Sequence, residues 1–250
     1  MVPINQTVAR VGIRWSRMGL VPSRFGVRAM RVSIKKGLRE IHERLWQAYG
    51  PQHWWPARTQ VEIVVGAILT QNTAWSNVER AIKNLRRAKV LTWSGLRDLP
   101  ASELVKLIRP SGTYEVKAKR LGSFVRYLWE NHNGSLRSLL SGELEKARER
   151  LLSIHGIGPE TADAILLYAG NRASFVVDAY TRRILRRHYL CKDRVTHEAV
   201  RKLFHASLPA DSRLFNEYHA LFVSLGKKHC RSRARCLGCP LEGMPHDPAL

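Results

Sequence analysis

One stretch of this chain, residues 151–165, limits what the chain can fold into more than any other. It reads as the end of a helix, a Gly-Ile-Gly turn at 156–158, and a second helix that begins at Pro159. Glycine has no Cβ, so the backbone N–H groups of such a turn can face outward, and proline is favoured at the first helical position. Because unpaired N–H groups at a helix N-terminus bind anions, the turn is suited to hold a phosphate.

The segment before the glycines distinguishes this turn from other Gly-x-Gly turns. Residues 144–154 also have a helical pattern, whereas a dinucleotide-binding site needs a strand before its glycines. After the turn, Ala162, Ile165, Leu166 and Ala169 have the spacing of one buried helix face. A Gly-x-Gly before a helix is by itself more often an ordinary turn. In this setting it predicts a helix–hairpin–helix element.

A carboxylate and two arginines follow the hairpin closely. Asp178 comes 18 residues after Glu160, at the end of an apolar run, and is followed by Arg182 and Arg183. An aspartate in such a position can be no more than a helix N-cap. A phosphate site, an isolated carboxylate and paired arginines within so short a stretch indicate chemistry on nucleic acid.

The hairpin and residues 176–183 together resemble the helix–hairpin–helix DNA glycosylases of the endonuclease III superfamily. The resemblance covers about residues 34–240. It implies an all-α, two-domain fold with the active-site cleft between the domains. On that template residues 57–172 form a helical barrel domain that ends in the hairpin, and residues 34–56 and 173–250 together form the second domain.

The spacing of apolar residues agrees with an all-α fold, because no alternating strand pattern of any length occurs. Residues 61–70 are apolar nearly throughout and could form a strand, but the resemblance favours a buried helix. The helices expected from the pattern are 38–49, 61–70, 76–88, 91–96, 101–108, 114–131, 136–140, 144–154, one from 159, 180–189, 197–208 and 215–230.

The charge of the chain indicates a polyanionic partner. Its 42 Lys and Arg against 20 Asp and Glu give a net charge of +22, and such an excess favours binding with release of counterions. Residues 1–39 contain basic residues and no acidic one, so we expect residues 1–33 to form a flexible basic arm. The same composition suits an organellar transit peptide, and a true start at Met30 is a third alternative.

No stretch is apolar and long enough to span a membrane, and there is no secretory signal. We therefore expect a soluble intracellular monomer, located in the cytoplasm or nucleoid if the source is bacterial, with no membrane partner.

The resemblance assigns catalysis to Asp178. Cleavage of an N-glycosidic bond builds positive charge on the sugar, which a nearby carboxylate stabilises, and the same group can align a water molecule. Glu160 stands where bifunctional members have a lysine that attacks C1′. A carboxylate cannot form that imine, so we expect a monofunctional glycosylase with Glu160 in its base pocket. A first-turn acid that merely suits the helix dipole is the simpler alternative.

The branch of the family that acts on 3-methyladenine and other alkylated purines is similar at Glu160 and at two further points. The tandem tryptophans Trp54 and Trp55 and the run from Thr70 to Trp75 match it, which implies aromatic stacking on a flipped cationic base. We expect one of the tandem tryptophans to pack in the core. Some members also have a pocket lysine on the last helix, where this chain has Leu221. The DNA-binding residues implied are Gln71, which would fill the gap left by the flipped base, with Gly156, Ile157, Gly158, Thr161, Arg182 and Arg183.

Three cysteines near the C-terminus resemble part of the four-cysteine iron–sulfur loop of the family. Cys230, Cys236 and Cys239 match it, but the fourth ligand is missing near Pro245. A 4Fe-4S cluster would therefore need a substitute such as His246 or Cys191. A zinc site and a metal-free basic loop are the alternatives, and the loop's arginines could contact phosphate in either case.

The resulting hypothesis is a base excision repair enzyme that flips a damaged base, an alkylated purine, out of double-stranded DNA and hydrolyses its glycosidic bond. Two rivals remain open. One is a bifunctional glycosylase/AP lyase that uses another amine such as Lys227 or Lys228. The other is a DNA-binding homologue without catalytic activity.

Overall fold

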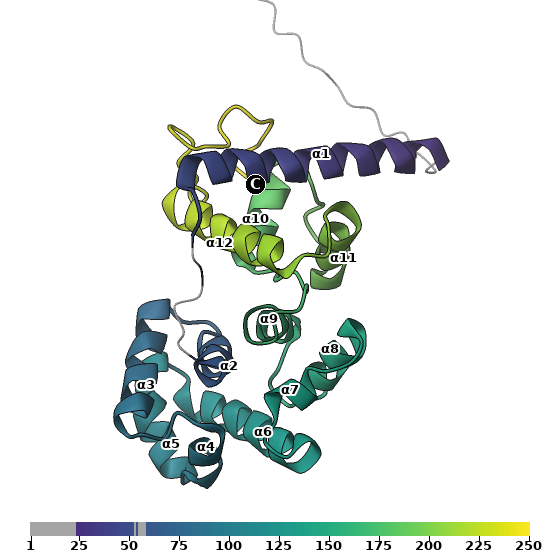
Figure 1. Ribbon diagram of the computed structural model, residues 1–250. Helices are drawn as coiled ribbons and strands as arrows, with labels where there is room; N and C mark the ends of the chain where they lie inside the picture. Colours follow the sequence, from purple (N-terminus) through teal and green to yellow (C-terminus); the bar gives the residue numbers. More distant parts are fainter. Residues whose placement is uncertain (1–23, 53, 55–58) are drawn as a thin grey trace, which may run out of the picture.

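The computed structural model describes residues 24–52, 54 and 59–250. The elements in this part of the chain are helices, with no strand among them, so the all-α prediction is confirmed (Figure 1). The first helices are α1 (Arg24–Tyr49), α2 (Gln60–Leu69), α3 (Trp75–Arg87), α4 (Trp93–Asp98), α5 (Ala101–Ile108), the 3₁₀ turn η1 (Arg109–Ser111) and α6 (Tyr114–His132). The others are α7 (Leu136–Leu139), α8 (Leu144–Leu152), α9 (Pro159–Ala164), the π-helical turn η2 (Ile165–Ala169), α10 (Ala179–Arg187), α11 (His197–Ser207) and α12 (Ser212–Lys228).

The helices agree with the predicted segments within a few residues, with one larger difference. Helix α1 begins at Arg24, whereas the apolar pattern predicted a start at Leu38. The apolar stripe of Leu38, Ile41 and Leu45 is fully buried, as predicted. Residues 1–23 of the predicted basic arm lie outside the described residues, as does Trp55.

Side-chain caps explain where several helices begin. Thr59, Thr92 and Thr196 stand at the N-caps of α2, α4 and α11, and each hydroxyl accepts a hydrogen bond from a backbone N–H three residues later. Asp211 caps α12 in a similar way. Such a cap stabilises a helix by about 1 kcal/mol because it satisfies an N–H that has no partner within the helix.

The helices form two groups with α9 between them (Figure 1). In one group α2 packs on α3 and α6, and α5 packs on α3 and α6. In the other group α12 packs on α1 and α10, and α1 also contacts α11. The predicted domain limits, 57–172 for one domain and 34–56 with 173–250 for the other, stay a prediction.

Buried aromatic residues form the centre of the second group. Phe175 stacks on Phe204 with ring centroids 3.5 Å apart, and Tyr218 packs edge-on against both rings. The Tyr218 hydroxyl donates a 2.6 Å hydrogen bond to the Leu38 carbonyl, which ties α12 to α1. No helix in the described part of the chain is long and apolar enough to cross a membrane.

A π-helical turn, η2, follows the hairpin's second helix and lies where the two groups meet. It packs on α2 from one group and on α12 from the other. The Gln60 side chain donates a 2.8 Å hydrogen bond to the Ala169 carbonyl at its end. Such turns widen a helix locally, change the direction of its side chains and are frequent at functional sites. Here the turn carries Tyr168.

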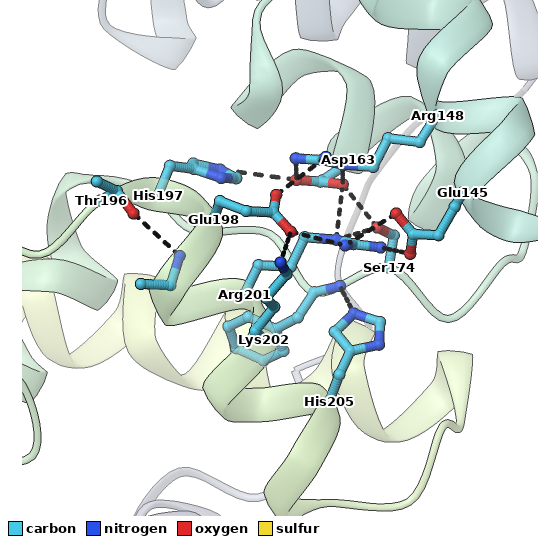
Figure 2. A network of polar contacts seen from close by, with 12 residues as sticks. Glu145, Arg148, Asp163, Ser174, Thr196, His197, Glu198, Arg201, Lys202 and His205 are labelled. Carbon is cyan, nitrogen blue, oxygen red and sulfur yellow. Dashed lines mark hydrogen bonds and ion pairs between the residues drawn. The ribbon is translucent and has the colours of Figure 1, made fainter.

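A buried ion network joins the hairpin to the second group of helices (Figure 2). Asp163 of α9 is fully buried and lies 2.8 Å from Arg148 Nε of α8 and 3.3 Å from Arg201 Nε of α11. Ser174 donates a 2.6 Å hydrogen bond to the same carboxylate, and Arg201 also pairs with Glu145 at 2.6 Å. Asp163 therefore ties both helices of the hairpin to α11.

Replacing Asp163 by alanine should leave two buried guanidinium groups without their central counter-charge. We expect a loss of about 3–5 kcal/mol in the free energy of unfolding, the usual cost of removing one partner from a buried ion pair. Urea denaturation measures it. As a control, Glu143→Ala removes an exposed carboxylate 3.9 Å from Lys146 and should change stability by less than about 0.5 kcal/mol. Equal, small effects for both variants would contradict the role given to Asp163.

Candidate active site and nucleic-acid interface

A cleft of about 1060 Å³ lies where the hairpin, the segment 70–75, the start of α10 and the inner face of α12 meet. It brings together most of the residues that the sequence singled out. Those that line it are Trp54, Gln71, Trp75, Gly156, Ile157, Gly158, Glu160, Thr161, Asp178 and Arg182.

Two residues named in the sequence analysis are placed elsewhere. Arg183 does not line the cleft; its Nε donates a 2.8 Å hydrogen bond to the Cys230 carbonyl, so its contact with DNA stays a prediction. Leu221 is fully buried in the core and does not line the cleft. The residues of α12 that do so are His219, Val223 and Lys227, so the position matched to the family's lysine is not a pocket position here.

Asp178 is both the N-cap of α10 and part of the cleft wall. Its Oδ1 accepts a 2.7 Å hydrogen bond from the Thr181 N–H, and its Oδ2 lies 3.6 Å from His219 Nε2. Burial alone would raise the pKa of the Asp178 carboxyl, but the interactions with His219 and Thr181 outweigh it and lower that pKa. The side chain keeps 13% of its surface exposed, so an ionised carboxylate faces the cleft.

Glu160, in the first turn of α9, is exposed to the same cleft. Removal of water by the surrounding walls and the negative charge of Asp178 raise the pKa of the Glu160 carboxyl, against the opposing effects of His219 and Arg182. The site therefore holds two carboxyl groups whose pKa values are shifted in opposite directions, which is characteristic of functional sites.

The two hairpin glycines differ in backbone conformation and in the space available for a side chain. Gly156 has φ +85°, a conformation that side chains rarely adopt, and a Cβ there would collide with the Arg120 side chain. Gly158 has φ −89° and a Cβ on it would meet nothing within 4 Å. The protein's own fold therefore requires glycine at 156 but not at 158, where the open space suits the approach of another molecule's backbone.

Gln71 lies against the hairpin. Its amide donates to the Gly156 carbonyl at 3.2 Å and to the Thr161 hydroxyl at 2.9 Å, while Arg120 donates to its amide oxygen. The side chain that is predicted to enter DNA is thus held by the element that is predicted to bind phosphate.

Two tryptophans reach the cleft from different segments. Trp54, half-buried in the loop between α1 and α2, has the Lys227 ammonium 5.4 Å from its ring centroid. Trp75 begins α3, and its indole N–H donates a 2.9 Å hydrogen bond to Glu79. Of the tandem pair, Trp54 lines the cleft, and Trp55 lies outside the described residues.

Three residues of the cleft were missed by sequence reasoning, namely Tyr168, His219 and Arg120, and Lys227 was named there only as the amine of the rival lyase. Tyr168 and His219 occur in apolar helical stretches, where an isolated polar ring usually packs in the core. The one available signal was the spacing of His219, Val223 and Lys227, which places them on one helix face at intervals of four residues.

The three C-terminal cysteines line a second, much smaller cavity, together with Arg187 and His246. Its volume of about 20 Å³ corresponds to room for about one water molecule. The Arg187 guanidinium, which is buried, donates to Cys230 Sγ at 3.3 Å and to the Arg231 carbonyl at 2.6 Å. A positive group therefore already occupies one side of the cysteine sulfur.

These residues do not fit a 4Fe-4S cluster. The loop has three cysteines, and of the two substitute ligands His246 lines their cavity while Cys191 does not. Among the described residues, no group of three or more His, Cys, Asp or Glu side chains is placed to hold a metal ion. The protein's own hydrogen bonds hold this loop instead, including the contact of His188 Nδ1 with the Pro245 carbonyl at 3.2 Å.

Comparison with known proteins identifies the family. The model of the HhH-GPD superfamily of base excision DNA repair proteins matches residues 65–210. A protein of Methanocaldococcus jannaschii, named provisionally as a DNA repair glycosylase, is 44% identical over 205 residues, covering 81% of this chain and 93% of that protein. The chain belongs to the HhH-GPD superfamily. Within that superfamily it is a DNA glycosylase.

Solved structures have the same fold as this HhH-GPD chain. A non-covalent endonuclease III–DNA complex has a TM-score of 0.74 at 22% identity, covering 84% of this chain and 94% of the other. The H. pylori 3-methyladenine DNA glycosylase bound to 1,N6-ethenoadenine has a TM-score of 0.65 at 27% identity, covering 79% and 97%. The two-domain helix–hairpin–helix glycosylase fold predicted from the sequence is thereby confirmed.

Alanine substitutions at the two hairpin glycines should separate folding from ligand contact. Gly156→Ala should lower the free energy of unfolding by at least about 1 kcal/mol, because it adds left-handed backbone strain and displaces Arg120. Gly158→Ala should leave stability within about 0.5 kcal/mol of the parent. Affinity for a DNA duplex, measured by fluorescence anisotropy, should nevertheless fall for Gly158→Ala. A stable Gly158→Ala variant with unchanged affinity would contradict the hairpin as a phosphate site.

Proposed function

We propose that this chain is a monofunctional DNA glycosylase that hydrolyses the N-glycosidic bond of an alkylated purine in double-stranded DNA. The observation that carries the proposal is the ionised Asp178 carboxylate on the wall of a cleft that also contains Glu160, Trp54, Trp75 and the hairpin. The hairpin amides and Arg182 would hold the phosphates beside the damaged nucleotide. Gln71 would leave the hairpin to fill the space of the flipped base.

Asp178 would act on the sugar. As the bond from C1′ to the base nitrogen breaks, its electron pair leaves with the base and positive charge grows on the deoxyribose. The carboxylate stabilises that charge and accepts a proton from the water molecule whose oxygen bonds to C1′. An alkylated purine that is already cationic leaves as a neutral base, so the leaving group needs no protonation.

Glu160 supports the monofunctional assignment and the choice of substrate. A carboxyl group cannot attack C1′ to give an imine, so the strand would be left uncut at an abasic site. Two carboxyl groups and two tryptophans also make a pocket that favours a flat, cationic base by charge and by cation–π attraction. The H. pylori relative at 27% identity acts on 3-methyladenine by its name, which supports this choice among lesions.

Asp178→Asn should reduce base release by at least about 100-fold, because the variant lacks the negative charge that stabilises the transition state. Asparagine is as good an N-cap as aspartate, so α10 should stay folded and duplex affinity should stay near that of the parent. Single-turnover release of 3-methyladenine or 7-methylguanine from alkylated DNA measures the loss. Full activity in the variant would overturn the assignment of Asp178.

Glu160→Gln should reduce the release of cationic bases more than the release of neutral bases. We expect release of cationic 7-methylguanine to fall by at least about tenfold, the effect of losing one charged interaction of about 1.5 kcal/mol, while neutral hypoxanthine or ethenoadenine is affected less. A lesion panel with alkylated, oxidised, deaminated and mismatched duplexes measures both. Equal losses for all lesions would contradict a charge-selective pocket. Release of no base from any duplex by the parent protein would favour a DNA-binding homologue without catalytic activity.

One observation favours a second candidate, a bifunctional glycosylase/AP lyase. Lys227 is the one lysine among the residues that line the described cleft, whereas Lys228 contacts Tyr49 outside it. Borohydride reduction during incubation with abasic-site DNA distinguishes the two. The monofunctional proposal expects no covalent protein–DNA adduct, and an adduct that disappears in Lys227→Gln would establish the alternative.

A further inference from the structure

A histidine and a tyrosine that the sequence did not single out stand behind the Asp178 carboxylate. His219, on α12, is 6% exposed, and its Nε2 lies 3.6 Å from Asp178 Oδ2. Its other ring nitrogen, Nδ1, lies 2.5 Å from the Tyr168 hydroxyl, on the π-helical turn. Three side chains from three separate elements therefore form a continuous row that ends at the cleft.

The surroundings of the ring determine which nitrogen carries the proton. Nε2 is buried and has no hydrogen-bond partner within the described residues; the carboxylate it faces is that of Asp178, 3.6 Å away, and the ring also interacts with the Glu160 carboxyl group. A lone pair on Nε2 would face a carboxylate oxygen, which is repulsive, whereas an N–H there is attractive. The tautomer at one ring nitrogen is set by the hydrogen bond at the other. The Tyr168 hydroxyl must then donate to Nδ1.

Tyr168 is suited to be that donor. Burial and the negative charge of Asp178 raise the pKa of the Tyr168 phenol well above its ordinary value, so it keeps its proton at any physiological pH. The π-helical turn explains how a residue in an apolar segment comes to face the cleft.

We propose that His219 is a positioning residue for the catalytic carboxylate: fixed by the Tyr168 hydroxyl, it presents Nε2–H to Asp178 and keeps that group ionised and directed at the sugar. The Thr181 N–H binds Oδ1, and in this arrangement the His219 N–H faces Oδ2 at 3.6 Å. The inference rests on the proposed function for the reaction that the carboxylate serves, while the row of side chains is a property of the free protein. The other titratable or charged groups that line the cleft are Glu160, Arg182, Lys227, Arg120, His155 and Tyr180.

The first test needs no substrate. The side-chain carboxyl of Asp178 can be titrated by ¹³C NMR, with Asp178→Asn to assign its signal. Its pKa should lie below the usual value of about 3.9 in the parent and should rise by about one unit or more in His219→Leu. Tyr168→Phe removes a single hydroxyl with little risk to folding and should raise the pKa by a smaller amount. His132→Gln, a histidine substitution on α6 far from Asp178 in sequence, is the control and should change nothing.

The second test is the pH dependence of base release under single-turnover conditions. Because a carboxylate acts only above its pKa, the acid limb of the profile should move to higher pH in both His219→Leu and Tyr168→Phe. At pH 7 the carboxylate stays ionised in His219→Leu but is no longer directed at the sugar, so release should fall about 10–100-fold with duplex affinity unchanged. His219→Gln should recover part of the loss because its amide can donate.

Folded variants in which neither the Asp178 titration nor the acid limb moves would overturn the role of His219. Tyr168→Phe keeps the proposal testable if His219→Leu does not fold. If the parent releases no base from any lesion, the proposed function fails, yet the NMR titration still decides whether His219 and Tyr168 control the ionisation of Asp178.

Discussion

The hydrogen bond from the Thr181 N–H to Asp178 Oδ1 is the contact on which the rest of the site depends. A capping carboxylate is fixed by the first turn of its own helix, so its direction does not depend on a flexible side chain. In this chain the capping role and the functional role of Asp178 are therefore not alternatives. The cap aims one oxygen at the helix and leaves the other free to face His219 and the cleft.

The distance between that carboxylate and the hairpin is controlled elsewhere, in the buried network around Asp163. Asp163 lies three residues after Glu160 on the same short helix, so any movement of the network would move Glu160 with it. Buried ions that lack a partner are costly, and this makes the arrangement of α8, α9 and α11 difficult to change. The two halves of the cleft are in this way held by charge as well as by apolar packing.

The C-terminal loop is held in place by the protein's own hydrogen bonds. A guanidinium from α10 donates to a cysteine sulfur and to the carbonyls of Arg231, Ser232 and Leu250, which orders the loop by hydrogen bonding. A buried arginine is well suited to this because its five donors form a rigid fork. The exposed arginines of the loop remain available to solvent and to phosphates.

The sequence alone determined the helices, the hairpin and those features that depend only on residues close together in the chain. Glycine at 156 is required by a positive φ, Pro159 marks a helix start, and the apolar period locates the buried faces, so each was predictable from a few neighbouring residues. The family resemblance added Asp178, Glu160 and Trp54, and the cleft contains all three.

Only the tertiary structure decided that Tyr168, His219 and Asp178 form one row. The tyrosine and the histidine are 51 residues apart and lie on helices whose apolar pattern is that of core segments. Their contact depends on a π-helical turn and on how α12 packs against it, and no short-range spacing encodes either of these. The shifts in the pKa values of Asp178 and Glu160 likewise arise from burial and from charges brought together by folding, which the order of residues along the chain does not reveal.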